Sequence, residues 1–236
     1  MHQMDMSTGV IVANAEESQR AAFIRRTYLH LGGAILLFMG IEALLLKSGV
    51  SESFMAVLAG SRWMWLVVLG VFMLVSVVAD RWARHPMSQG MQYAGLGLYA
   101  VAEALIFMPV IYMATRFAPD VLPNAALITL ALVAGITFTA FTTRKNFSFL
   151  GPILGIGGIV ALGVIVASVI FGFSLGLVFS GLMIIFAAGS ILYTTSNIIH
   201  EYHTDQHVAA ALSLFSSVGL MFWYVTQFLM SMAGDN

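Results

Sequence analysis

Two carboxylates stand inside long apolar stretches of the sequence, where an ionisable side chain is unusual. Glu42 lies near the end of the apolar run 27–46, and Glu103 lies near the middle of the run 91–114. An ionisable group at the centre of a membrane-spanning helix costs about 2.5–3.5 kcal/mol on insertion scales, so it marks a candidate functional site. Two interpretations of Glu103 fit: a carboxylate that binds a proton or a cation, and a protonated acid that hydrogen-bonds a neighbouring helix. For Glu42 we favour a side chain that extends to water at the interface.

A second group of chemically active side chains lies in the polar segment 194–207, which separates the last two apolar runs. This segment carries three histidines spaced i, i+3 and i+7, together with two acidic residues: His200, His203, His207, Glu201 and Asp205. The spacing puts the imidazoles on one face if the segment is helical, and imidazole with carboxylate suits zinc or another transition metal. Histidines that titrate near neutral pH in a hydrated loop are a common alternative. Metal binding, pH sensing and no specific role therefore all stay open.

A serine-hydrolase motif also occurs, but in a context that does not favour catalysis. The sequence Gly172-Phe173-Ser174-Leu175-Gly176 matches G-x-S-x-G, which works at a strand-to-helix elbow with histidine and aspartate partners beside it. Here the motif separates two apolar runs, and the histidines are predicted at the opposite face of the membrane. The absence of cysteine excludes disulfides and thiolate metal sites. We therefore expect no enzymatic activity and no cofactor.

The composition indicates the environment in which these side chains lie. The chain has 236 residues, of which 60% are hydrophobic and 9% charged, whereas an ordinary soluble domain has about 25% charged residues. Such a chain has too little polar surface to face water on all sides, so its expected partner is the lipid bilayer. The net charge of −1 and the scattered basic residues give no support to nucleic-acid binding.

Seven apolar runs are long enough to cross a bilayer, since a spanning helix needs about 20 residues. They are 27–46, 63–79, 91–114, 121–142, 149–171, 174–193 and 208–232, and the polar tail 1–26 precedes them. The predicted fold class is an all-α integral membrane protein with seven transmembrane helices. Asp80 and Arg81 are predicted to form an ion pair at the end of the second run.

The distribution of lysine and arginine predicts the orientation, because cytoplasmic loops are enriched in both. With the N-terminus in the cytoplasm, seven basic residues lie inside and three outside: Arg20, Arg25, Arg26, Arg81, Arg84, Arg144 and Lys145 against Lys47, Arg62 and Arg116. An odd number of spans then puts the C-terminus outside.

Small residues at close-packing positions predict where helices approach each other. Glycines recur in pairs at Gly32 and Gly33, at Gly95 and Gly97, and at Gly151 and Gly155. The glycine-rich run 149–171 is therefore predicted to be a central packing strut.

Four segments carry a resemblance to a known family. They are Phe23-Ile24-Arg25-Arg26-Thr27-Tyr28, Thr142-Thr143-Arg144-Lys145-Asn146-Phe147-Ser148-Phe149-Leu150-Gly151, Ile191-Leu192-Tyr193-Thr194-Thr195-Ser196-Asn197-Ile198-Ile199-His200 and Ala211-Leu212-Ser213-Leu214-Phe215. In these segments and in its seven runs, the sequence resembles the Bax inhibitor (TMBIM) family, on its bacterial YccA-like branch. The resemblance implies a bundle with one central helix, in the bacterial inner membrane.

The resemblance implies two functions. Some members are pH-sensitive calcium leak channels, gated by one aspartate in the sixth span and one in the seventh. YccA-like members bind and modulate the membrane-anchored AAA protease FtsH, and are slow substrates that enter through the N-terminal tail. We favour the modulator of FtsH. The alternative is a calcium, cation or proton leak that uses Glu103, Glu42 or the histidine-rich segment.

The sequence departs from the channel pattern at its gate. The two aspartate positions correspond to Thr194 and Ser217, and neither hydroxyl ionises near neutral pH. A carboxylate pair that titrates as a coupled unit is therefore missing. We predict that Thr194 and Ser217 instead hydrogen-bond across the two helices, at about 0.6 kcal/mol, as a static latch without pH dependence.

Overall fold

The structure is a computed structural model that describes residues 9–86, 88–143 and 145–234. This part of the chain forms one three-residue 3-10 turn, Val12–Asn14, and eight α-helices. The helices are α1 Glu17–Lys47, α2 Val50–Gly60, α3 Arg62–Ala83, α4 Gln89–Phe117, α5 Val121–Thr143, α6 Leu150–Phe171, α7 Gly176–His200 and α8 His207–Gly234. All except α2 are long and apolar enough to cross a membrane. The prediction of an all-α membrane protein with seven spanning helices is confirmed.

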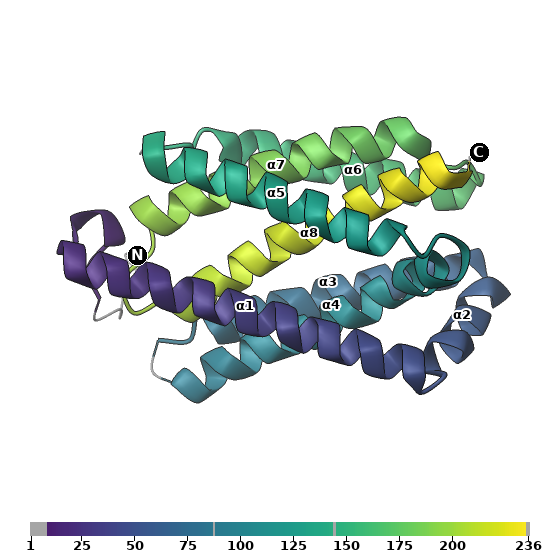
Figure 1. Cartoon of the computed structure of the whole chain (residues 1–236), viewed down its shortest axis with the longest axis horizontal. Helices are drawn as coiled ribbons and strands as arrows, with labels where there is room; N and C mark the ends of the chain where they lie inside the picture. Colours follow the sequence, from purple (N-terminus) through teal and green to yellow (C-terminus); the bar gives the residue numbers. More distant parts are fainter. Residues whose placement is uncertain (1–8, 87, 144, 235–236) are drawn as a thin grey trace.

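Two helices lie inside the bundle. In the most apolar window of each span, 72% of the residues of α4 and 61% of those of α8 are buried, against 22% or less in the other spans. Helix α8 packs against α1, α3, α4, α5 and α7, and it crosses the molecule diagonally between α1 and the group of α5 and α7 (Figure 1). Helix α8 is therefore the central helix of the bundle.

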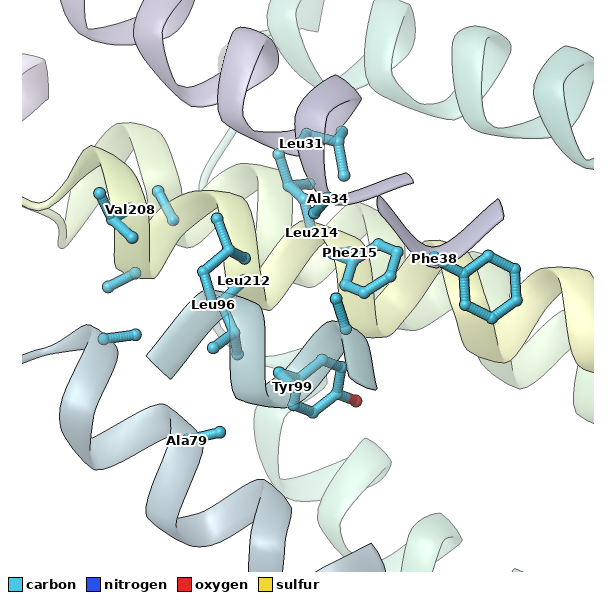
Figure 2. Close-up of a cluster of buried hydrophobic side chains, with 14 of the residues drawn as sticks. Leu31, Ala34, Phe38, Ala79, Leu96, Tyr99, Val208, Leu212, Leu214 and Phe215 are labelled. Atoms are coloured by element: carbon cyan, nitrogen blue, oxygen red, sulfur yellow. The ribbon is translucent and has the colours of Figure 1, made fainter. Parts of the chain in front are cut away.

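The largest group of buried apolar side chains joins α8 to α1, α3 and α4. Figure 2 shows Leu31 and Phe38 of α1 meeting Phe215 of α8, with Tyr99 of α4 on the other side of α8. The Phe215 ring lies edge-on to both neighbours, with ring centroids 6.2 Å from Phe38 and 5.9 Å from Tyr99. Water does not drive helices together in a bilayer, so this close packing holds the four helices in place.

One glycine lets two helix backbones touch. A Cβ atom at Gly95 of α4 would lie 2.5 Å from Ala83 N and 2.6 Å from Ala79 O of α3. The equivalent position at Gly97 has no atom within 4 Å, and the same holds for Gly32, Gly33 and Gly155. Close packing was thus predicted correctly at Gly95, whereas these other glycines face open space. Gly151 faces a side chain instead, the ring of Tyr193 on α7.

Helix α6 lies at the edge of the bundle, so the prediction of a central strut at 149–171 is wrong. Only 6% of its apolar window is buried, and it packs against α7 and α3 alone among the helices. Its mean hydropathy of 2.7 is the highest of the seven spans. A helix that is apolar on all sides can face lipid as easily as protein, so its glycine and proline content does not determine its place.

The first helix and the second differ from the sequence prediction. Helix α1 begins at Glu17 and not at residue 27, and the short helix α2 was not predicted. Residues 1–8 of the predicted tail, and Arg144 of the orientation count, lie outside the described residues. Residues 9–16 precede α1.

Candidate functional site

The bundle contains a cavity of about 830 Å³ between α3, α4, α6, α7 and α8. Its lining runs from Ser174, Gly176 and Gly234 down to Glu103 and Ser217. We call the end of the bundle with Ser174 and Gly234 the open end. The opposite end, with residues 9–16 and the connections α3–α4, α5–α6 and α7–α8, is the closed end (Figure 1).

Glu103 is the one charged residue among those that line the cavity. Its side chain is 3% exposed, and its Oε2 atom has no hydrogen-bond partner in the described part of the chain. The carboxyl group fits against α8 because position 219 is glycine: a Cβ atom there would overlap Glu103 Oε1. A buried polar atom without a partner is costly. Within the described residues the Oε2 atom thus makes no hydrogen bond to a neighbouring helix, and both interpretations of Glu103 stay predictions.

Aromatic side chains form the wall of the cavity towards α3. The Trp65 and Trp223 rings are stacked with centroids 6.0 Å apart, and Trp223 lies edge-on to Phe107 at 5.0 Å. Tyr99 also lines the cavity, and its hydroxyl donates to Ser216 Oγ at 2.8 Å. The wall is thus largely aromatic beside a single carboxyl group.

Three hydroxyl groups meet beyond Glu103, towards the closed end. Ser217 Oγ donates to Ser213 O of its own helix at 3.1 Å. It lies 3.1 Å from Thr194 Oγ1 and 3.2 Å from Ser190 Oγ, so both of these hydroxyls donate to it. The predicted hydrogen bond between Thr194 and Ser217 is present. Ser190 was missed, although it precedes Thr194 by one helical turn and therefore shares its face.

The closed end carries a second polar network around Arg84, which follows α3. Arg84 Nε donates to both Asp80 oxygens at 2.9 Å, and Nη2 donates to the Tyr202 hydroxyl at 2.9 Å. The Tyr202 hydroxyl also contacts Ser213 Oγ at 2.8 Å. Burial lowers the pKa of Arg84, but the interactions with Tyr202 and Asp80 outweigh it and hold this pKa above its usual value. Asp80 therefore pairs with Arg84 and not, as predicted, with Arg81.

Residues 10–15, the docked segment, lie across the connection between α7 and α8. Val12 N donates to Tyr202 O at 2.9 Å, and Thr204 N donates to Val10 O at 3.0 Å. These bonds flank an antiparallel bridge between Ile11 and His203. The Val12 side chain is fully buried. The segment before α1 is thus partly folded onto the closed end.

The histidine-rich segment does not form the single face that a continuous helix would give. Helix α7 ends at His200 and α8 begins at His207, so the three imidazoles belong to three different elements. His200 Nδ1 bonds Ser196 O at 2.9 Å, while the His207 ring packs against the ring of His30 on α1, centroids 5.0 Å apart. Glu201 is exposed, and Asp205 lies beside Gly9.

Metal binding by this segment finds no support in the geometry. Within residues 9–86, 88–143 and 145–234, no group of three or more histidine, aspartate or glutamate side chains is arranged to hold a metal ion.

Glu42 is buried away from the cavity. It is 4% exposed, and neither carboxyl oxygen has a hydrogen-bond partner in the described residues. The expectation that its side chain extends to water is wrong. The pattern of apolar runs did not predict α2, which packs against α1 and α4.

Comparison with known proteins gives matches along nearly the whole chain. A family model described as "Inhibitor of apoptosis-promoting Bax1" matches residues 20–234. Protein lifeguard 4 of Mus musculus is 24% identical over 226 residues, which cover 95% of this chain and 91% of the relative. Bax inhibitor 1 of Schizosaccharomyces pombe is 27% identical over 230 residues, or 92% of this chain and 79% of the relative. No solved structure matches.

Proposed function

The chain belongs to the Bax inhibitor (TMBIM) family of multi-pass membrane proteins, and we propose that it is a slow cation leak whose path runs through the cavity and past Glu103. The observation that carries this proposal is the buried carboxyl group of Glu103, the one acidic residue that lines the cavity, whose Oε2 atom has no hydrogen-bond partner in the described part of the chain. A lone carboxylate in a low-dielectric site attracts cations and repels anions.

The closed end supplies the barrier in this proposal. Towards the closed end the cavity lining includes Ser190 and Ser217, and the Ser217 hydroxyl bonds those of Ser190 and Thr194. Beyond them lie the Arg84 network and the docked segment. Opening such a path requires that hydroxyl bonds between α7 and α8 break. Because hydroxyls do not titrate near neutral pH, this barrier does not respond to pH as a pair of aspartates would.

The test is calcium and proton flux in proteoliposomes at pH 6 and pH 8. Wild type is expected to leak slowly, and Glu103→Gln is expected to lower the leak about ten-fold because it removes the one carboxyl group that lines the cavity. The double change Thr194→Asp with Ser217→Asp is expected to add a pH dependence. Glu42→Gln is the matched control, since this buried glutamate does not line the cavity. Flux equal to that of protein-free liposomes would reject the proposal.

A second proposal is that the protein modulates a membrane AAA protease of the FtsH type and is itself a slow substrate. The docked segment supports it. A protease that pulls on the polar N-terminal residues must first break the backbone bonds of Val10 and Val12 and then unwind α1 from Glu17. The need to break these bonds slows degradation, while the protease can still bind the N-terminal residues.

The test is the lifetime of the protein in cells that contain the protease. Deletion of residues 1–8 is expected to lengthen the lifetime, because the protease loses the N-terminal residues on which it would pull. Val12→Asp, which puts a charge at a fully buried position, is expected to shorten it by releasing the docked segment. Equal lifetimes of all three proteins would reject this second proposal.

A further inference from the structure

We propose that the cavity binds amphiphilic organic cations, with the ammonium group at Glu103 and the apolar part against Trp65, Phe107 and Trp223. This inference deepens the proposed function by naming an occupant of the same cavity. Binding does not require conduction, so the two can be tested separately.

The charge of the occupant follows from the lining. Glu103 is the one charged residue that lines the cavity, and no lysine, arginine or histidine lines it. Glu103 is 3% exposed, and its Oε2 atom has no hydrogen-bond partner among the described residues. An ammonium group supplies the hydrogen-bond donors that this oxygen lacks and balances the charge. The site therefore favours a ligand with one positive charge.

The neighbouring oxygens argue against a bare divalent metal ion. Ca²⁺ takes six to eight oxygen ligands at about 2.3–2.6 Å, and the cavity offers a single carboxyl group. The hydroxyl of Ser217 is already bonded to Ser190, Thr194 and Ser213. The Ser216 hydroxyl accepts from Tyr99. One free carboxyl oxygen suits one ammonium group better than a coordination shell.

The wall beside Glu103 suits the apolar part of the ligand. Trp65 stacks on Trp223, and Trp223 meets the edge of Phe107. Aromatic faces attract an ammonium group and also bury alkyl or aromatic groups. The cavity volume of about 830 Å³ lies in the range of about 300–1,000 Å³ that is typical of small-molecule sites. An ammonium ion with a short chain and one aromatic ring fits these features.

The experiment compares 4-phenylbutylammonium with 4-phenylbutan-1-ol, which has nearly the same shape and no charge, on the purified full-length protein in detergent. Binding is followed by tryptophan fluorescence, to which Trp65 and Trp223 contribute, and by the shift in Tm. We expect the amine to bind wild type at least about ten-fold more tightly than the alcohol, which corresponds to about 1.4 kcal/mol. In Glu103→Gln this preference is expected to vanish, and in Glu42→Gln to persist.

Each result decides. Equal binding of amine and alcohol to wild type overturns the inference, and so does an amine preference that survives Glu103→Gln. If Glu103→Gln does not fold, the comparison of the two probes on wild type and on Glu42→Gln still decides, because absence of an amine preference there overturns the inference. Amine preference in a protein that shows no flux supports the inference and rejects the leak. A leak without amine preference overturns the inference and supports the leak.

Discussion

The two ends of the bundle are built differently. At the closed end, polar groups from separate elements bond each other: Arg84 with Tyr202, Tyr202 with Ser213, and the backbone of Val12 with that of Tyr202. At the open end, the cavity separates the helices, and residues such as Ser231 bond only the preceding turn of their own helix. The closed end is therefore cross-linked by a polar network that joins several elements, whereas the open end is held mainly by side-chain packing, together with an ion pair between the exposed side chains of Arg116 on α4 and Glu52 on α2.

This difference indicates at which end of the bundle the helices separate at the lower free-energy cost. Separating helices at the closed end requires breaking hydrogen bonds between elements, which costs most where they are buried and less where, as at Arg84, the side chain is partly exposed to water. Separating them at the open end changes mainly apolar contacts, which lipid replaces at little cost. A ligand or ion would thus enter at the open end, and the closed end would set the barrier to its passage.

The largest loss of stability is expected from Gly95→Ala, at the closed end. The new methyl group would meet backbone atoms of Ala79 and Ala83, so α3 and α4 must move apart. We expect a loss of about 2 kcal/mol in the free energy of unfolding, as for other overpacked sites. Unfolding by SDS titration, followed by circular dichroism, measures it. Gly97→Ala is the control, since no atom lies within 4 Å of its Cβ position, and equal losses in both variants would show that the close contact of α4 with α3 at Gly95 does not account for the effect.

A smaller effect is expected from Arg84→Ala. The change removes the bonds to Asp80 and Tyr202, but the Arg84 side chain is 43% exposed, and water weakens what is lost. We expect destabilisation of about 1 kcal/mol, together with a faster leak in proteoliposomes. Arg81→Ala, an exposed neighbour on α3, serves as the reference. Unchanged stability and unchanged flux would show that the Arg84 network does not hold the closed end together.

The smallest effect is expected from Ser217→Ala. It removes the acceptor for Ser190 and Thr194, and hydrogen bonds between membrane helices average about 0.6 kcal/mol. The same SDS titration measures this loss. Ser231→Ala, near the open end of the same helix, removes only a bond to Gln227 O and is expected to be nearly neutral. If the two serine variants lose the same stability, hydrogen bonds between helices do not distinguish the ends.

The sequence predicted the spans well because a run of about 20 apolar residues has few alternatives to crossing a membrane. It did not predict which span is central, since α6 is more apolar than α8 yet faces outwards. It marked Glu103 as unusual, but the carboxyl group depends on Gly219 of α8, which lies far away in the sequence.

Helical spacing did not decide which short polar contacts were predicted. Thr194 and Ser217 were paired through the family resemblance, and Ser190 was missed although helical periodicity puts it on the same face as Thr194. Helix α3 continues to Ala83, beyond the predicted span, so the partner of Asp80 is one turn away at Arg84 and the adjacent Arg81 was chosen wrongly. The docking of residues 10–15 carries no local signal, because its partner is the connection between α7 and α8.

The bridge between Ile11 and His203 joins segments near opposite ends of the chain. During synthesis it cannot form until the residues around His203 have left the ribosome and the preceding spans have been inserted. Until then the docked segment stays accessible to chaperones and proteases at the membrane surface. Its docking therefore requires the connection between α7 and α8, and a chain that stops before this connection would leave the docked segment exposed.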